Sequence, residues 1–466
     1  MGDEMRTEHD SMGAVEVPRD AYYGAQTARA ARNFRISSLR FSRRFIGALG
    51  FVKAAAARVN MALGLLDAQV GAAIEQAARE VAAGRFDDEF VVDVFQTGSG
   101  TSTNMNTNEV IATRAAELLG AERGDRRAVH PNDQVNLGQS TNDVFPTALH
   151  VAALDGVDGH LLPALRRLAD ALDRKAVEWA AIVKAARTHL QDAVPITLGQ
   201  EFSGYASVVR HGVTRVSATR SHLGELAIGG TAAGTGLNAH PEFADRVCRE
   251  LGALTGLAVR RADNPFEAMQ NRDAAVELSG ACRTVAVGLM KLANDLRLLS
   301  SGPLTGLAEI ALPDLQPGSS IMPGKVNPVI PEAVNMVAAQ VIGHDAAIAV
   351  AAMNGSLDLN TMMPIIAHDL LEMLEMLGNA CAALATCVDG IEADVDRCRF
   401  FAERSPSVAT ALAPVIGYDA AAALVKEALA DGVAIADAIR AHPQISPQQA
   451  EHVLDVLALT RGGRFD

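Results

Sequence analysis

The chain has 466 residues, of which 49% are hydrophobic and only 4% are aromatic, and its formal net charge is −14. A core of aliphatic side chains with few rings favours closely packed helices over a β-sandwich or barrel. The acidic balance argues against a nucleic-acid partner, because phosphates need a basic surface. An anionic substrate must therefore be bound by a local cluster of donors, against the field of the whole protein.

The five cysteines are odd in number and form no CxxC pair. This usage predicts buried structural thiols in a reducing compartment, and the spacing of Cys381, Cys387 and Cys398 fits no common iron–sulfur pattern. No HExxH motif or His/Cys array points to zinc, so we expect neither a metal nor a cofactor.

The N-terminal residues 1–20 mix both charge signs without an apolar core, so no signal peptide is expected. Apolar runs such as 346–357 are shorter than the roughly 20 residues that a bilayer span requires. These features predict a soluble, cytoplasmic protein without a membrane partner.

Apolar residues at helical spacing recur along most of the chain, after a polar and broken segment at about 1–40. The predicted helices are 45–66, 68–83, one starting near 106, 161–183, 272–299, 332–348 and 365–391, with almost no strand candidates. Several are longer than twenty residues and apolar on more than one side. This pattern predicts a helical bundle that also packs across subunits.

Three polar clusters lie ahead of predicted helices in the first third of the chain. Gln96 to Asn104 is an uncharged run of hydroxyls and glycines, which suits an anion site at a helix N-terminus, although plain N-capping explains it about equally well. His130 to Asp133 and Gln139 to Asp143 follow, and Ser140 to Asp143 is expected to surround the next helix start.

Two further stretches interrupt the helical pattern. Thr188-His189 lies among amide and carboxylate side chains, which raises His189 above the usual structural role of a lone histidine. The glycine-rich run Gly229 to Asn238 lacks the lysine of a nucleotide-binding P-loop and no strand leads into it. We therefore expect a tight loop between helices near the site.

The stretch Gly318 to Pro328, followed by Glu332, carries the most specific chemistry. Its glycines allow backbone N–H groups to be exposed and its prolines stiffen the loop. Lys325 and Asn327, two residues apart, can point to one side and join Ser319 in binding a small anion. A surface turn is the weaker interpretation, because apolar helical sequence flanks the loop.

These clusters together can hold a small carboxylate and move protons. Removing a proton next to a carboxylate builds a second negative charge on it, so the site must aim preorganised donors there. Lys325, Asn327 and loop N–H groups could supply them. His189 is the residue available near neutral pH to protonate a leaving group.

The segment Gly318 to Asn327 closely resembles the pattern of the fumarase/aspartase superfamily. The segments His130 to Asp133, Thr188-His189, Gly229 to Thr231 and Ile416 to Asp419 resemble the class II, iron-independent fumarases. The similarity runs from about Arg6 to Leu459. It implies a mainly α, three-domain subunit with an N-terminal helical domain (1–139), a central bundle (140–393) and a small C-terminal domain (394–466).

The resemblance further implies a homotetramer whose central helices assemble across subunits and whose active sites each draw on three subunits. It implies a lyase of the tricarboxylic acid cycle, a fumarate hydratase that interconverts fumarate and (S)-malate by metal-free acid/base catalysis. Carried over by motif position, Ser319 is the base, with its alkoxide stabilised by Lys325 and loop amides. His189, paired with Glu332, serves the leaving hydroxyl.

The other implied site residues form two groups. The substrate carboxylates are bound by Ser99, Thr101, Ser140, Thr141, Asn142, Thr188, Lys325 and Asn327. A second, non-catalytic anion site comprises Arg127, His130, Asn132 and Asp133.

Two alternatives stay open at this point. An aspartate ammonia-lyase is suggested by Thr141, where fumarases usually have serine, and Leu359-Asn360-Thr361 also departs from the usual Leu-Asn-Val. A fumarase is favoured by three other stretches, namely Gly229 to Thr231, Phe266 to Ala268 and Ile416 to Asp419. A helical binding protein that lost the chemistry is disfavoured, because a retired site has no need for a strained polar loop.

Overall fold

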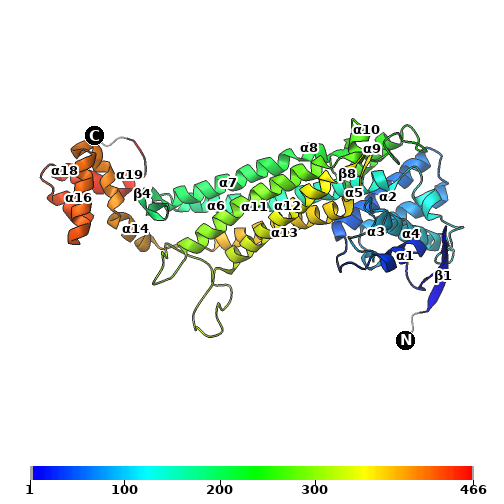
Figure 1. Cartoon of the computed structure of the whole chain (residues 1–466), viewed down its shortest axis with the longest axis horizontal. Helices are drawn as coiled ribbons and strands as arrows, with labels where there is room; N and C mark the ends of the chain where they lie inside the picture. Colours follow the sequence, from blue (N-terminus) through cyan, green and yellow to red (C-terminus); the bar gives the residue numbers. More distant parts are fainter. Residues whose placement is uncertain (1–3, 464–466) are drawn as a thin grey trace. The chain divides into compact units, whose positions relative to one another are not determined.

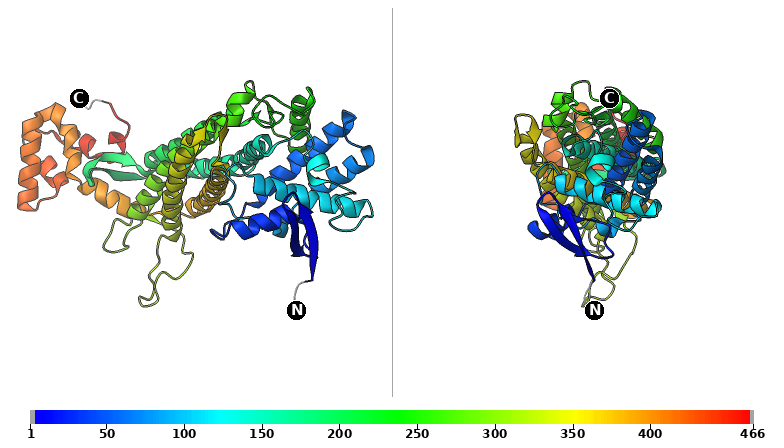
Figure 2. Two further views of the ribbon diagram at one scale, coloured as in Figure 1. Left: turned by 45° about the vertical axis from the view of Figure 1, so that its right-hand side comes forward. Right: turned by 90° about the vertical axis from the view of Figure 1, so that its right-hand side faces the viewer.

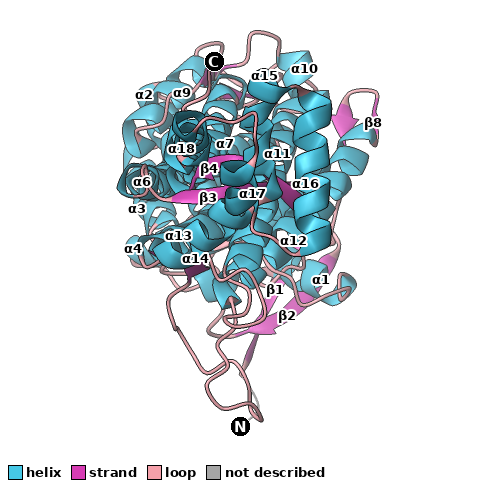
Figure 3. Cartoon of the chain, turned by 90° about the vertical axis from the view of Figure 1, so that its left-hand side faces the viewer, coloured by secondary structure: helices cyan, strands magenta, loops and turns pink. Residues whose placement is uncertain are grey.

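The computed structural model describes residues 4–463, so the first three residues of the N-terminal segment lie outside the described part. Helices dominate, and strands occur as short pairs (Figure 3). The predicted mainly α fold is confirmed. The chain forms two compact units, unit 1 (1–163, 214–286 and 339–378) and unit 2 (164–213, 287–338 and 379–466). The three-domain division stays a prediction.

Unit 1 starts with an antiparallel hairpin, β1 (Met5–Asp10) and β2 (Gly13–Pro18), where the sequence predicted only a broken polar segment. Figure 2 shows the two strands side by side next to the N-terminus. The helices that lie wholly in unit 1 are α1 (Ala25–Asn33), α2 (Arg43–Ala62), α3 (Ala68–Ala82), α4 (Thr101–Leu118), α5 (Thr141–Gly156), α8 (Arg220–Leu223), α9 (Phe243–Thr255) and α10 (Pro265–Gln270). Short helical turns occur at η1 (Asp87–Glu89), η2 (Pro131–Val135) and η3 (Val157–Leu161).

Helix α2 is the centre of unit 1 and packs against α3, α5 and α9. Its apolar residues Phe45, Leu49 and Val52 are fully buried, as the helical spacing predicted. The crossing with α3 is close at Gly50, where an added Cβ would lie 2.6 Å from the backbone nitrogen of Ala82. Only glycine fits this approach.

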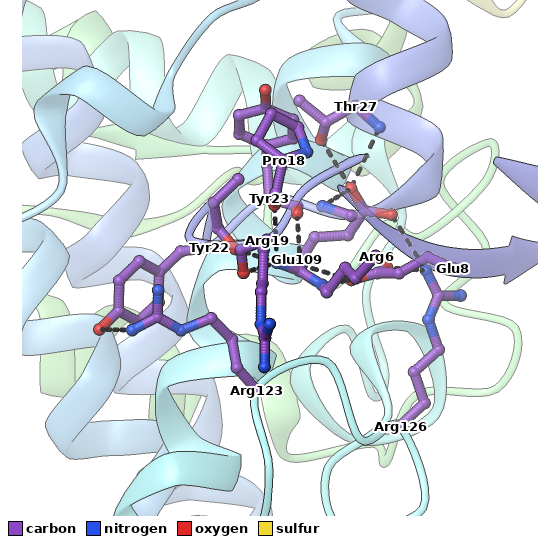
Figure 4. A network of polar contacts seen from close by, with 12 residues as sticks. Arg6, Glu8, Pro18, Arg19, Tyr22, Tyr23, Thr27, Glu109, Arg123 and Arg126 are labelled. Atoms are coloured by element: carbon purple, nitrogen blue, oxygen red, sulfur yellow. Dashed lines mark hydrogen bonds and ion pairs between the residues drawn. The ribbon is translucent and has the colours of Figure 1, made fainter. Parts of the chain in front are cut away.

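The buried carboxylate of Glu109 on α4 holds the start of α1 (Figure 4). Its Oε2 accepts hydrogen bonds from the N–H groups of Gly24 (2.9 Å) and Thr27 (3.1 Å) and from the Thr27 hydroxyl (2.7 Å). Arg126 lies 3.3 Å from Oε1. A carboxylate is favourable at a helix N-terminus, because it satisfies free N–H groups and complements the helix dipole. Burial raises the pKa of Glu109, and the hydrogen bonds from Thr27, Gln26 and Gly24 oppose that shift.

Five long helices, labelled in Figure 1, each contribute residues to both units. They are α6 (Leu162–Glu178), α7 (Leu198–Ala218), α11 (Asp273–Leu299), α12 (Val329–Met353) and α13 (Met363–Asp389). Within unit 1, Asp345 of α12 accepts hydrogen bonds from Ser279 and Arg283 of α11, both at 2.7 Å. Within unit 2, Tyr205 of α7 donates to Asp295 of α11 at 2.8 Å. The predicted helices 272–299, 332–348 and 365–391 are therefore confirmed, with shifted ends.

The predicted helix 161–183 is too long. Helix α6 ends at Glu178, and Val183 starts an antiparallel hairpin of β3 (Val183–Thr188) and β4 (Gln191–Thr197). The remaining strand pairs are β5 (Glu225–Leu226) with β6 (Arg260–Arg261), β7 (Ile310–Ala311) with β10 (Glu392–Ala393), and β8 (Gly355–Ser356) with β9 (Leu359–Asn360). The C-terminal part of unit 2 contains α14 (Val395–Arg404), η4 (Pro406–Leu412), α15 (Ala413–Ile416), α16 (Tyr418–Asp431), α17 (Ile435–Ala441), α18 (Pro447–Leu454) and α19 (Val456–Leu459).

Three helices in the described part of the chain are long and apolar enough to cross a membrane, judged by length and composition alone. They are α2, α12 and α13, so the prediction that all apolar runs are too short is wrong for these helices. Within one chain, 78% of the apolar 18-residue stretch of α2 is buried, and 61% of the corresponding stretch of α13. Only 28% of the stretch in α12 is buried. The apolar surface of α12 is therefore largely uncovered within one chain.

Candidate active site

The first group of predicted site residues lies in unit 1 at the start of α4. Gly100, with φ of 83°, precedes the helix, and the hydroxyls of Ser99 and Thr101 lie 2.9 Å apart. The sequence predicted a helix from about Asn106, but α4 begins at Thr101, so the second half of the hydroxyl-rich run is helical. Gln96 Oε1 accepts the Thr103 N–H at 3.0 Å, so the N–H groups of Thr101 and Ser102 are the ones left in the first turn for an anion.

The second group in unit 1 surrounds the start of α5, as the sequence predicted. Ser140 is the N-cap residue, its hydroxyl oxygen accepts the N–H of Asn142 at 3.2 Å, and Asp143 completes a capping box. Asn142 donates its side-chain N–H to the carbonyl of Ala232 at 2.8 Å. Thr141 is buried, and Asn104 of α4 donates to its hydroxyl oxygen at 3.0 Å.

The glycine-rich run 229–238 is a series of turns, in agreement with the predicted loop. Asp143 connects it to α5, because its Oδ2 accepts the N–H groups of Gly229 and Thr231, each at 2.9 Å. Its Oδ1 accepts the Ser140 N–H at 2.9 Å. One fully buried carboxylate thus fixes both the helix start and the loop beside it.

The predicted second anion site, also in unit 1, carries little surplus positive charge. Arg127 is largely exposed, and its guanidinium contacts Asp125 at 3.2 Å. His130 Nδ1 accepts the N–H of Asp133 at 3.1 Å, which caps the short helical turn η2. Asn132 and Asp133 are exposed on this turn. An anion here would face two carboxylates as well as the guanidinium and the imidazole.

In unit 2, Thr188 and His189 lie at the tip of the β3–β4 hairpin, and both are exposed. His189 and Leu190 form the two-residue turn, and each has φ of 58°, in the left-handed region. Such a turn normally contains asparagine or glycine, because other side chains are strained there. Strain of this kind is typical of functional positions.

Buried charges anchor this hairpin below its tip. The carboxylate of Glu309 is fully buried and lies 2.9 Å from Arg187 and 3.3 Å from Lys184, both on β3. Lys184 also lies 2.7 Å from Glu201 of α7. These ion pairs hold the base of the hairpin, so the strained turn projects from a fixed support.

The loop before α12 folds back on itself. The Gly318 N–H donates to the Lys325 carbonyl at 2.8 Å, and the Asn327 side chain donates to the Gly318 carbonyl at 2.7 Å. An added Cβ on Gly318 would lie 2.6 Å from the Lys325 carbonyl oxygen, so glycine is required there. The Ser319 hydroxyl oxygen accepts the N–H groups of Ile321 (3.2 Å) and Met322 (3.0 Å).

Lys325 is exposed at this loop, and Glu332 lies half-buried in the first turn of α12. Among the residues that the structure describes, His189 and Glu332 make no hydrogen bond or ion pair with each other. Unit 1 thus brings together Ser99 with Thr101 and Ser140 with Thr141 and Asn142. Unit 2 holds Ser319 next to Gly318, which bonds the Lys325 carbonyl and the Asn327 side chain, and it holds Thr188 and His189 on a separate hairpin.

A lyase family model matches residues 13–343, and a model of the fumarase C C-terminus matches residues 408–461. A class II fumarate hydratase of Mycobacterium tuberculosis is 53% identical over 467 residues, covering 99% of this chain and 97% of the relative. One of Halobacterium salinarum is 54% identical over 464 residues, with coverages of 99% and 98%. The chain belongs to the class II fumarate hydratase family.

Solved structures support this membership. A class II fumarase of Schistosoma mansoni superposes with a TM-score of 0.95 at 38% identity, covering 98% of this chain and 99% of that one. A cobalt-bound fumarate lyase of Brucella melitensis, also described as a delta crystallin, gives a TM-score of 0.94 at 47% identity, with coverages of 98% and 100%. The fumarase resemblance and the family fold inferred from the sequence are confirmed.

Sequence reasoning did not single out Lys53 and Asn136, which lie behind the predicted site residue Thr141, although Asn104 and Asp143 belong to the polar clusters that it named. Lys53, Asn104 and Asn136 form a polar network behind Thr141, and Asp143 fixes the loop beside it. The one available signal was a lysine in the middle of α2, flanked by the apolar residues Phe51, Val52 and Ala54. Its partners come from segments more than eighty residues away, so no local pattern identifies them.

The five cysteines are all buried and form no disulfide bond within residues 4–463, as predicted for structural thiols. Burial raises the pKa of the Cys381 thiol to about 12 and that of Cys387 to about 11. Such thiols are inert near neutral pH. Within residues 4–463, no cluster of three or more His, Cys, Asp or Glu side chains could hold a metal ion.

Proposed function

We propose that this protein catalyses the reversible hydration of fumarate to (S)-malate, with a small dicarboxylate as substrate and without a metal or cofactor. The observation that carries the proposal is the pair of backbone N–H groups on the Ser319 hydroxyl oxygen. Two preorganised donors stabilise an alkoxide, which turns a poor base into a usable one. Lys325, from the same loop, adds a positive charge.

In the direction of dehydration, Ser319 takes a proton from C3 of malate. The electron pair of that C–H bond moves into the adjacent carboxylate, which then carries a second negative charge. As the double bond forms, the C2 hydroxyl leaves with a proton from His189, and the products are fumarate and water. Hydration is the same sequence in reverse.

The proposed donors to the substrate carboxylates form two sets, which different subunits of an assembly would supply. Ser99, Thr101, Ser140, Thr141 and Asn142 come from unit 1, and Thr188, Lys325 and Asn327 come from unit 2. The start of α4, where Gly100 supplies no side-chain cap, supports anion binding by Ser99 and Thr101, whereas the Ser140 hydroxyl already caps α5. Carboxylates accept hydrogen bonds only, and this inventory consists of hydroxyls, amides and a cation that donate.

We also propose a homotetramer in which each active site combines residues of three subunits. Met336, Val350 and Met353 on α12 are 68%, 57% and 77% exposed in the single chain. An apolar helix surface of this size favours contact with other subunits. The pairing of His189 with Glu332 would then form between chains, consistent with their lack of contact within one. A soluble, cytoplasmic tetramer of the tricarboxylic acid cycle would cover these surfaces without a membrane.

The cluster of Arg127, His130, Asn132 and Asp133 remains proposed as a second anion site outside the catalytic centre. Because carboxylates of Asp125 and Asp133 lie within it, we expect weak binding. Calorimetric titration with succinate would test this site. An Arg127→Ala variant is expected to lose a weak binding event while malate turnover stays unchanged.

One assay tests the reaction. The purified, chelator-treated protein receives malate or aspartate, and fumarate formation is followed by ultraviolet absorbance. We expect fumarate from malate only. Turnover of aspartate alone would favour an ammonia-lyase, silence on both would favour a binding protein, and loss of malate turnover after chelation would contradict the metal-free mechanism.

A mixing experiment tests the shared active site. Thr101→Ala and Ser319→Ala chains, each inactive as pure tetramers, would be denatured, mixed in equal amounts and refolded. If a site takes Thr101 and Ser319 from different subunits, about a quarter of the sites are intact. No recovery in tetramers proven to be mixed, for example by mass tags, would place both residues of each site in one chain.

A further inference from the structure

A fully buried lysine lies behind the start of α5. Lys53 is 0% exposed on α2, and its ammonium donates to Asn136 Oδ1 at 2.8 Å and to Gln139 Oε1 at 3.0 Å. Burial lowers the pKa of Lys53 to about 7, and the carboxylate of Asp143 opposes that shift. A buried cation is costly unless its donors are all used, so a purely apolar packing role does not explain it.

The hydrogen bonds around Lys53 have a defined direction. An ammonium group only donates, so Asn136 must present its oxygen to Lys53. Asn104 therefore faces the same oxygen with its NH₂ group, at 3.3 Å, and this NH₂ also donates to Thr141 Oγ1 at 3.0 Å. Because the hydroxyl oxygen of Thr141 accepts a hydrogen bond from Asn104, the hydroxyl hydrogen of Thr141 points away from Asn104.

We propose that Lys53 is a positioning residue that acts through Asn136 and Asn104 to make Thr141 a hydrogen-bond donor toward a substrate carboxylate. The inference rests on the proposed function in one respect, namely that Thr141 contacts the substrate. A carboxylate oxygen accepts, whereas an ammonium or amide NH₂ donates, so the imposed direction favours a carboxylate at this position. The buried lysine thus contributes to specificity without touching the ligand.

Succinate, a four-carbon dicarboxylate that cannot react, is the probe for the test. Its Kd is measured by calorimetry on the full-length assembly for wild type, Lys53→Met, Thr141→Val and the double variant. We expect each single variant to weaken binding about tenfold, as for the loss of one hydrogen bond. In the Thr141→Val background, Lys53→Met should change the Kd less than about twofold, since the two residues act in one chain of contacts.

A matched pair of variants guards against misfolding of Lys53→Met. Asn104→Leu removes the direct donor to Thr141, and Asn106→Leu removes an equally buried amide on the same helix that donates to the Glu89 carbonyl at 2.9 Å. Both should lower the melting temperature by similar amounts. Only Asn104→Leu is expected to weaken succinate binding about tenfold.

The inference is overturned if Lys53→Met weakens binding equally with and without the Thr141 hydroxyl, or if Asn104→Leu and Asn106→Leu affect the Kd alike. An unchanged Kd in Thr141→Val also overturns it. Malate turnover is measured separately. If the Kd values of the variants follow the expected pattern but the wild-type protein does not dehydrate malate, the proposed reaction is contradicted. The role of Lys53 in succinate binding is then still supported.

Discussion

The backbone N–H of Met322 donates a hydrogen bond of 3.0 Å to the hydroxyl oxygen of Ser319. The N–H of Ile321 donates to the same oxygen at 3.2 Å. The closed loop between Gly318 and Asn327 holds these groups in place, so the stabilisation does not require reorganisation during the reaction. The serine hydroxyl of this loop is therefore already in the environment that a catalytic alkoxide needs.

Ser319→Ala is expected to lower kcat for malate by at least about 10²-fold, the lower end of what a lost proton-transfer group costs. KM should change little, because the carboxylate donors remain. Steady-state rates by ultraviolet absorbance provide the measurement. The exposed neighbour Ser320, changed to alanine, is the matched control and should retain most activity. Near-normal turnover of Ser319→Ala would exclude this serine as the base.

His189→Asn separates the chemistry of the imidazole from the strain of the turn. Asparagine tolerates the left-handed region better than histidine, so the hairpin should be equally stable or more stable. The kcat for malate should nevertheless fall about 10²-fold, because the acid that protonates the leaving hydroxyl is lost. Leu190→Asn, at the other strained position, is the control and should keep its activity. Equal loss of rate in both variants would assign the effect to the turn.

Asp143→Asn should change how stability depends on pH. Burial raises the pKa of Asp143 from 3.8 to about 7, and the hydrogen bonds from Ser140, Thr231 and Gly229 oppose this shift. The folded state therefore binds more protons than the unfolded state between pH 4 and 7, so this carboxyl's contribution to stability is full at low pH and is lost as pH rises to about 7.

Urea unfolding between pH 4 and 8 at one protein concentration measures this difference. The midpoint of wild type should fall relative to that of Asp143→Asn as pH rises through the window. Removal of the Asp143 carboxylate also lowers the pKa of Lys53 further. The variant should therefore gain stability relative to wild type as pH rises, which adds to the effect of the lost carboxyl group. Parallel curves for the two proteins would show that Asp143 is ionised throughout.

Glu109→Gln should destabilise the N-terminal region of unit 1. Either orientation of the amide places its NH₂ group against N–H donors, those of Gly24 and Thr27 or that of Gln26, so the free energy of unfolding should fall by about 2 kcal/mol. Hydrogen exchange of α1 amides and the urea midpoint are the readouts. Glu16→Gln, an exposed residue on β2 with one side-chain hydrogen bond from Thr7, should cause little change. A comparable loss from both substitutions would argue against the buried carboxylate as the anchor.

The sequence by itself determined the helical class and, through the loop at 318–328, the family resemblance. Helical periodicity is local, so α3 and α11 could be placed within about a residue. The loop could be recognised because its glycines, prolines, Ser319 and Lys325 are adjacent in sequence. Ser140 could be assigned to a helix start for the same reason, since a capping box spans four residues.

Only the tertiary structure decided which groups support these local features. The β3–β4 hairpin was not predicted, because its strands depend on buried ion pairs with Glu309, more than a hundred residues away. Lys53 and Asn136 are separated by 83 residues, and nothing in α2 alone indicates that its lysine is buried and faces a threonine of another helix through two amides. Burial and the direction of hydrogen bonds are set by the surrounding segments, and local sequence patterns do not carry that information.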